Sequence, residues 1–347
     1  MDCRMTLHVD IDLSAFERNV AKLVNTAAPA SVWVALKSHA YGHGMTELAD
    51  NALRAGATGL AVLDIPAALS LRAHGVTATL FAWLHGQETD FAEAVAQGID
   101  IGVSTLNQLD AVAEAGRLQK VPARVHLKVD TGLHRNGFTE SDWVAACSAA
   151  AAHEKQKLIV VVGVWSHLAD ASEEADRIAL SRFDTAIAAA ASVGLKPTIR
   201  HIAASAAGFT NADARYDVVR FGILAYGVSP FSESSGQQLG LSPVMSLRST
   251  AEVHDESTIR IHAGWHDGIP QNPKGAWVLV GGERCTVTAV HPLFTLAERP
   301  AGFDDGSSVG IIGHGGPSAE DWASWTNTIG DEIVTGIPVT SRRVFGG

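Results

Sequence analysis

An eightfold alternation between two kinds of segment is the feature that most limits how this chain can fold. Short apolar stretches rich in β-branched and aromatic residues alternate with alanine-rich stretches that suit helices. The apolar stretches are residues 32–37, 58–64, 78–84, 99–104, 124–130, 158–167, 198–205 and 218–227. Near-continuous apolar strands are typical of a parallel sheet covered by helices. The pattern predicts an α/β fold, with a (β/α)8 TIM-type barrel favoured over a doubly wound open sheet, which would alternate in the same way.

The last third of the chain has a different pattern. Residues 232–240 are polar and contain two glycines, as expected of a linker. Beyond them, residues 277–290 and 307–313 alternate between apolar and polar positions, which is typical of half-buried antiparallel strands. We therefore expect a barrel domain over residues 1–232 and a smaller, mostly antiparallel β domain over residues 241–347.

Composition narrows the class of partner. The chain has 347 residues, 46% of them hydrophobic, which is enough to fill the cores of two domains. Only 18% of residues are charged and the net charge is -11, so a basic surface for nucleic acid is not expected. No apolar run approaches the length of a membrane span, and the N-terminus lacks the apolar core of a signal peptide. A small-molecule partner is the best expectation.

The cysteines and histidines indicate neither a disulfide framework nor a metal site. Cys3, Cys147 and Cys285 are few and scattered, which is typical of a protein kept in a reducing compartment such as the cytoplasm. The 15 histidines show no two-histidine spacing followed by a carboxylate. A metal-dependent barrel hydrolase is therefore the weakest of the enzyme classes considered.

Polar side chains that can do chemistry gather where the expected strands end. Lys37, Lys128, His167 and Ser205 each end an apolar stretch, and Arg220 lies within the last one. Barrel enzymes build their active sites at this edge. A lysine that ends a buried strand is poorly hydrated, so its pKa falls and it can hold an aldehyde as a Schiff base. The alternative is a lysine that simply ends its strand in solvent.

The stretch SVWVALKSHAYGHG, residues 31–44, closely resembles the cofactor-lysine motif of the alanine racemase family, which are fold type III enzymes dependent on pyridoxal 5'-phosphate (PLP). The resemblance continues in order through residues 128–138, 165–172, 201–208 and 217–230. It implies PLP bound by Lys37, a small amino acid as substrate and a homodimer. The expected reaction is racemisation or epimerisation at Cα.

The same resemblance implies roles for individual residues. Arg135 would approach the 3'-oxygen of PLP, His167 would pack on its ring and Arg220 would face its pyridine nitrogen, while Lys128 occupies a position that is often carbamylated. The implied cofactor-binding residues are Lys37, Tyr41, Trp83, Lys128, His167, Ser205, Arg220, Gly222 and Ile223. Each position also has an ordinary structural explanation, such as a turn around Arg135 or an ion pair between Arg220 and Asp217.

Arg220 is the position most informative about the reaction. Most PLP enzymes place a carboxylate at the ring nitrogen, which makes the ring a deep electron sink. A guanidinium there keeps the nitrogen unprotonated and limits how much negative charge the ring accepts. Proton exchange at Cα then suits the site better than elimination or transamination does.

The resemblance fails in the C-terminal third, so the chain is a divergent member. The family's second base is a tyrosine from the partner subunit's C-terminal domain, and it should lie between residues 242–253 and 263–270. That segment is short and contains no tyrosine; the chain's three tyrosines are Tyr41, Tyr216 and Tyr226. Asp331 also stands where the family has a tyrosine that reaches the phosphate, and Ala204 where it has an asparagine.

Two kinds of function remain open beside the racemase. Another acid or base from the β domain would restore chemistry on both faces, and the candidates are His262, His266, Asp267 and His291, although HAGWHDG could equally be a polar turn. We assign catalytic roles to His266 and Asp267 together with Lys37, Arg135 and Arg220. Without a second base the enzyme would use one face only, as a decarboxylase, retro-aldolase or β-eliminase. The third possibility is a non-catalytic PLP carrier.

Overall fold

The computed structural model describes residues 7–347, so the prediction about Cys3 lies outside the described residues. The chain forms two compact units. The first contains the described part of Met1–Val20 together with Ser38–Ala55 and Ile223–Gly347, and the second contains Ala21–Lys37 and Gly56–Gly222.

The second unit is the predicted barrel. All eight predicted apolar stretches contain a strand, and the strands are β2 (Ser31–Ala35), β3 (Gly59–Val62), β4 (Thr79–Ala82), β5 (Asp100–Val103), β6 (Ala123–Lys128), β7 (Ile159–Trp165), β8 (Ile199–His201) and β9 (Val218–Phe221). They form one parallel sheet in the order β8-β7-β6-β5-β4-β3-β2-β9. The N–H of Asp217 donates to the carbonyl of Arg200 at 3.1 Å and that of Arg220 to Ala203 at 3.1 Å, which joins the last strand to β8. The sheet is therefore closed, and the open-sheet alternative is wrong.

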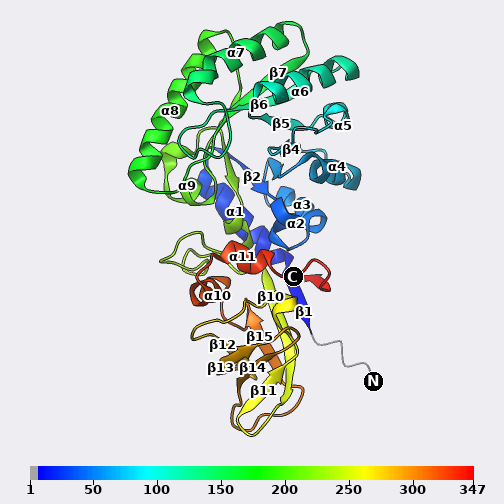
Figure 1. Ribbon diagram of the computed structural model, residues 1–347, viewed down its shortest axis with the longest axis vertical. Helices are drawn as coiled ribbons and strands as arrows, with labels where there is room; N and C mark the ends of the chain where they lie inside the picture. The colour runs from blue at the N-terminus through cyan, green and yellow to red at the C-terminus, as the bar shows by residue number, and fades with distance from the viewer. Residues whose placement is uncertain (1–6) are drawn as a thin grey trace. The chain divides into compact units, whose positions relative to one another are not determined.

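Helices cover the outside of this sheet (Figure 1), as a parallel sheet requires. They are α4 (Ile65–His74), α5 (Ala92–Ala96), α6 (Leu106–Gln119), α7 (Glu140–Lys155), α8 (Glu173–Ser192) and α9 (Ser205–Thr210). The helices α4, α6, α7 and α8 begin where a side-chain oxygen of Asp64, Thr105, Thr139 or Ser172 accepts a backbone N–H of the first turn. The helix α1 (Leu13–Ala27) begins in the same way, because Asp12 accepts the N–H of Ala15 at 2.7 Å.

The barrel interior is aromatic and contains buried polar groups. Trp33, Phe81 and Trp165 form its core with small residues of the neighbouring strands. His126 and His201 lie among these rings with no exposed surface, and Phe81 packs on both at 4.9 and 5.2 Å. Barrel interiors are usually filled by branched aliphatic side chains, so two histidines here require a reason.

The first unit contains the β domain. Its sheet has the order β11-β14-β13-β12-β15-β10-β1-β16, and its pairs are antiparallel except β1 with β16. The strands are β1 (His8–Asp12), β10 (Met245–Val253), β11 (Thr258–Ile261), β12 (Trp277–Val280), β13 (Glu283–Val290), β14 (Thr295–Glu298), β15 (Ser308–Ile312) and β16 (Arg343–Gly346). The predicted strands at 277–290 and 307–313 are confirmed as β12, β13 and β15.

The N-terminal strand β1 joins this sheet although it precedes the barrel in sequence. His8–Asp12 pairs with both β10 and β16. The same unit carries α2 residues 38–41, α3 (Met45–Arg54), α10 (Ala319–Thr326) and α11 (Gly330–Thr335). The domain bounds of 1–232 for the barrel and 241–347 for the β domain stay predictions. Within residues 7–347, no helix combines the length and apolarity needed to cross a membrane.

Candidate active site

Lys37 lies two residues beyond the end of β2 and begins α2 (Lys37–Tyr41), a turn of unusual hand. Ser38, His39, Ala40 and Tyr41 have φ values of 52°, 56°, 56° and 51°, all left-handed. Left-handed geometry costs an L-residue about 1–2 kcal/mol, and consecutive strained residues persist mainly where function requires them. None of the four residues is glycine or asparagine, so this turn could not be predicted from residue types.

Arg220, in β9, is buried and held on several sides. Its Nη1 donates to Nδ1 of His201 at 2.8 Å, and its Nη2 lies 2.9 Å from the carbonyl of Ser166, 3.1 Å from that of Ile202 and 3.2 Å from Nδ1 of His167. Burial lowers the pKa of Arg220 to about 9, which leaves the guanidinium protonated at neutral pH.

The alternative ion pair between Arg220 and Asp217 does not form. Asp217 instead accepts from Nε and Nη2 of Arg200 at 2.7 and 2.9 Å. Arg220 is therefore a buried cation without a directly bonded carboxylate among its hydrogen-bond partners.

Lys128, at the end of β6, is almost fully buried, with 2% exposure. Its Nζ donates to Oδ1 of Asn136 and lies 4.4 Å from the centre of the Trp165 ring. Burial, followed by the cations Arg135 and Arg220, lowers the pKa of Lys128 to about 7. A large fraction of this amine is therefore neutral and nucleophilic near pH 7.

His167 lies just beyond β7, at the same end of the barrel, and is kept neutral. Burial lowers its pKa well below the ordinary value, and the charges of Arg220, Arg135, Lys128 and Lys37 lower it further. These four cations come from four different places in the barrel sequence. The structure therefore brings together the lysines and arginines that the sequence singled out.

The remaining predicted residues of the barrel unit lie near strand ends. The N–H of Gly222 donates to Oγ of Ser205 at 2.9 Å. Ala204 precedes α9 and offers no side-chain bond to it, consistent with the loss of a polar group at that position. Trp83 follows β4, is half-buried and packs 6.3 Å from Phe81.

The other two predicted cofactor-binding residues belong to the first unit. Tyr41 is buried against Tyr226 at 4.8 Å between ring centres, and burial and the nearby Asp331 raise its pKa. Ile223 begins a buried turn of 3-10 helix, Ile223–Tyr226. Their assignment to the cofactor stays a prediction.

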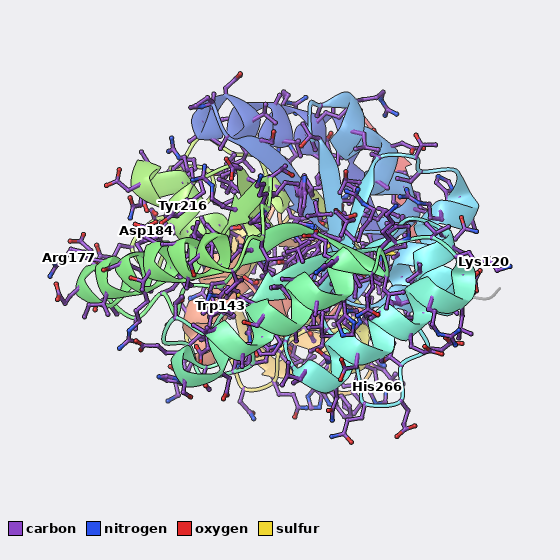
Figure 2. The ribbon with its side chains drawn as sticks, turned by 90° about the horizontal axis from the view of Figure 1, so that it is seen from above. Lys120, Trp143, Arg177, Asp184, Tyr216 and His266 are labelled. Atoms are coloured by element: carbon purple, nitrogen blue, oxygen red, sulfur yellow. The ribbon has the colours of Figure 1, made fainter. Side chains whose placement is uncertain are left out.

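The third tyrosine has a structural partner on the outside of the barrel. The hydroxyl of Tyr216 donates to Asp184 of α8 at 2.8 Å, and Figure 2 shows the two residues beside each other. Burial and this carboxylate raise the pKa of Tyr216, which moves the hydroxyl away from any role as a base near neutral pH.

His266 and Asp267 lie in a short 3-10 turn of the first unit, Trp265–Asp267. Oδ2 of Asp267 accepts the N–H of Gly264 at 2.9 Å, and the exposed His266 ring contacts the Trp265 ring at 4.1 Å between centres. These local contacts describe a polar turn. A catalytic role for either residue stays a prediction.

The residues at the barrel mouth fit PLP by their chemistry. Four cations surround one neutral imidazole, while Asp130, which also acts on Lys128, is bonded to His134 at 2.9 Å. Such a set suits a ligand that carries anionic oxygens and an aldehyde. Among residues 7–347, no group of three or more His, Cys, Asp or Glu side chains is arranged to hold a metal ion.

Fold and site together define a two-domain barrel enzyme of the PLP-dependent isomerase class. The family model for the N-terminal domain of alanine racemase matches residues 11–230, and that for the C-terminal domain matches residues 245–345. The chain belongs to the alanine racemase family.

Relatives match over nearly the whole length. The alanine racemase of Thermobifida fusca is 38% identical over 97% of both chains, and that of Salinispora arenicola is 38% identical over 94% of both. The crystal structure of alanine racemase from D-cycloserine producing Streptomyces lavendulae has a TM-score of 0.95 at 34% identity, over 99% of this chain and 97% of that one. The enzyme of Streptomyces coelicolor A3(2) gives a TM-score of 0.93 at 34% identity over 99% of both chains.

Proposed function

We propose that this chain is a PLP-dependent racemase that acts at Cα of a small amino acid, with alanine as the first substrate to test. The cluster of Lys37, Lys128, Arg135 and Arg220 around neutral His167 is the observation that carries the proposal. The names of the full-length relatives support the choice of alanine. When bound, PLP would supply an aldehyde that forms a Schiff base with Lys37 and a ring that stabilises negative charge at Cα.

Each barrel residue then has a defined task. The amine of Lys37 holds the cofactor and moves the Cα proton on one face. Arg220 donates to the ring nitrogen and, as a cation, keeps it unprotonated. His167 packs on the ring without adding charge. Arg135 binds the anionic ring oxygen, whose charge it complements, and Lys128 lies near Arg135.

The phosphate would lie against the other predicted groups. Ser205, the backbone N–H groups of Gly222 and Ile223, and the hydroxyl of Tyr41 are donors suited to phosphate oxygens. Trp83 would bound the pocket. Replacing Tyr41 by Phe should raise the dissociation constant for PLP more than it changes kcat, since a hydroxyl that contacts only the phosphate does not touch the reacting atoms.

The second face of Cα also needs a proton donor, and residues 242–270 contain no tyrosine that could serve. We propose that the β domain of a partner subunit supplies it, with His266 and Asp267 as first candidates and His262 and His291 as further ones. Histidine can donate or accept a proton near neutral pH. This arrangement requires a homodimer, with residues 1–232 as the barrel domain and 241–347 as the β domain, and we place the enzyme in the cytoplasm.

A one-face enzyme is the second candidate, and one observation favours it. Residues 242–270 contain no tyrosine, so the family's second base is missing from its expected segment. Such an enzyme would decarboxylate, cleave or eliminate, and would exchange the Cα proton with retention. A protein that binds PLP but turns over no amino acid would instead be a carrier.

Incubation of the PLP-loaded protein with L-alanine in D2O separates these functions. Racemisation predicts D-alanine that carries deuterium at Cα, whereas a one-face enzyme gives deuterated L-alanine only. Lys37→Ala should remove both the visible absorbance of bound PLP and the exchange. Lys155→Ala, at the exposed end of α7, is the matched control and should leave both unchanged. No deuterium in either enantiomer would contradict the proposal.

A further inference from the structure

Arg220 stands at the end of a buried chain of hydrogen bonds that crosses the barrel interior. Nδ1 of His201 accepts from Arg220 at 2.8 Å, Nε2 of His201 lies 2.9 Å from Nδ1 of His126, and Nε2 of His126 lies 3.1 Å from Oδ2 of Asp100. Asp100 is 1% exposed and both histidines 0%. The four residues come from β5, β6, β8 and β9, so this series of hydrogen bonds spans the barrel.

The protons in this chain can be arranged in one way only. Arginine has donors and no acceptor, so Nδ1 of His201 must be unprotonated. The proton of His201 is then on Nε2 and is donated to Nδ1 of His126. His126 must therefore carry its own proton on Nε2, which donates to the carboxylate of Asp100. Every bond points from the guanidinium toward the carboxylate.

The charges fit this arrangement. Burial, followed by the charge of the neighbouring Arg220, lowers the pKa of His201 well below its ordinary value, so its imidazole is neutral. Burial opposes the charged form of Asp100, but bonds from His126 and Arg124 hold its pKa below the ordinary value. The cation at one end is thus balanced by an anion at the other, with two neutral rings between them.

The backbone makes room for this chain. A Cβ on Gly163 of β7 would lie 2.2 Å from Nδ1 of His126, the atom that accepts from His201. Buried polar chains are seldom more stabilising than apolar packing of the same volume, so stability alone is a weak reason to keep one. A role in orienting a functional group is the stronger reason.

We propose that Asp100, His126 and His201 are positioning residues that fix the orientation of Arg220 toward the ring nitrogen of the cofactor. The inference rests on the proposed function, because it takes PLP as the ligand that Arg220 meets. His201 fixes Nη1 while the carbonyls of Ser166 and Ile202 fix Nη2, so the plane of the guanidinium cannot rotate.

The proton arrangement is tested first in the PLP-free protein. Nitrogen-15 NMR of labelled histidine should show His126 and His201 neutral, each with its proton on Nε2. This measurement needs no variant and no cofactor. It therefore tests the proton positions in the hydrogen-bonded series even if the wild-type protein fails to take up PLP. A proton on Nδ1 of His201, or a doubly protonated ring at either position near neutral pH, would overturn the inference.

The positioning role is tested in the PLP-loaded protein with nitrogen-15 at the ring nitrogen. His126→Leu removes the hydrogen bonds that join His201 to Asp100, so Arg220 is no longer held in place. The nitrogen-15 signal of the PLP ring nitrogen should then move toward the protonated range. We expect kcat to fall about 10- to 100-fold, the range seen when an outer partner of a functional side chain is removed, with a smaller change in KM. His126→Gln can accept from His201 and donate to Asp100, and it should restore most of kcat and the wild-type signal.

Asp217→Asn is the matched control. Asp217 accepts hydrogen bonds from Nε and Nη2 of Arg200, which is also an arginine of the barrel, and its carboxylate bonds to none of the four residues in the hydrogen-bonded series. It should leave the ring-nitrogen signal and kcat at the wild-type values. A folded His126→Leu protein that binds PLP with the wild-type signal and kcat would overturn the positioning role. Absence of PLP absorbance in the wild-type protein would instead count against the proposed function.

Discussion

Lys37 and Lys128 are two lysines at the same barrel edge with different surroundings. Lys37 is half-buried and precedes a strained left-handed turn, whereas Lys128 is enclosed beside Trp165 and two arginines. A lysine deprived of water and near cations holds its proton weakly. The two amines are thus suited to different reactions, and the environment rather than the residue type decides between them.

We predict that Lys128 becomes carbamylated. With a pKa of about 7, roughly half of this amine is unprotonated at pH 7, against less than about 1 in 1,000 for an ordinary lysine. The neutral amine can take up carbon dioxide, and the resulting anion would lie beside Arg135 and Arg220. We expect protein kept in carbon-13 bicarbonate at pH 7 to show a carbamate signal that disappears in Lys128→Ala.

Lys155→Ala is again the control, because Lys155 is exposed at the end of α7. Its removal should leave the carbamate signal unchanged. A wild-type spectrum without this signal, or a signal that survives Lys128→Ala, would show that Lys128 does not bind carbon dioxide.

At the scale of strands and helices, the apolar pattern of the sequence was sufficient to predict all eight barrel strands. Each stretch is short, apolar and followed by a helix with its own cap, so the information is local. The pairing of β1 with β10 and β16 is not local. It joins residues more than two hundred positions apart, and nothing in His8–Asp12 indicates its partners.

The buried histidines show a second limit. Single histidines within the apolar stretches 124–130 and 198–205 have no spacing that distinguishes them from ordinary core residues. One signal was present, however. His126 is two residues before Lys128 within β6, so the alternation of a strand places His126 on the same face as a predicted site residue. Their mutual contact depends on pairing across the sheet and needed the structure.

Gly163→Ala tests how closely the barrel interior is packed around His126. The added Cβ would lie 2.2 Å from the His126 ring and 2.9 Å from the carbonyl of Ile199, and neither the ring nor the backbone can retreat easily. We expect unfolding free energy to fall by about 1–3 kcal/mol, as in other overpacked cores, in a urea titration. Gly86→Ala, whose nearest atom is the Thr89 hydroxyl at 3.9 Å, should change stability little. Equal stability of the two variants would contradict the close packing around His126.

Across the whole molecule, buried neutral histidines couple stability to pH. Burial lowers the pKa of both His43 and His85 to about 4. Burial also lowers the pKa of His201 well below the ordinary value of a histidine. Above pH 6.5 these rings are neutral in both the folded and the unfolded chain. Below it the unfolded chain binds protons first, so stability falls as the pH falls toward 4.

His43 makes this prediction testable. Its folded pKa of about 4 corresponds to about 3 kcal/mol of lost stability at pH 4 relative to neutral pH. His43→Asn, which retains a donor for the carbonyls of Ala40 and Tyr41, should flatten the decline in unfolding free energy between pH 6.5 and 4. His254→Asn, at an exposed position, should leave the slope unchanged. An unchanged slope in both variants would exclude His43 as a source of the acid sensitivity.

The predicted site residues are distributed unevenly over the molecule. The barrel half contains the predicted cations, whereas residues 242–270 of the β-domain half contain no tyrosine. A second acid or base from a partner subunit would reconcile family membership with that absence. Size measurement in solution should therefore give a dimer, and a monomer with full racemase activity would contradict this arrangement.

Every role proposed for the barrel residues depends on Lys37 carrying PLP at the mouth of the barrel. The most direct measurement is to load the protein with PLP, reduce it with borohydride and locate the stable pyridoxyl label by mass spectrometry of its peptides. We expect one label per chain, on Lys37, and none on Lys128. A label on another lysine, or no label on a folded protein saturated with PLP, would contradict it.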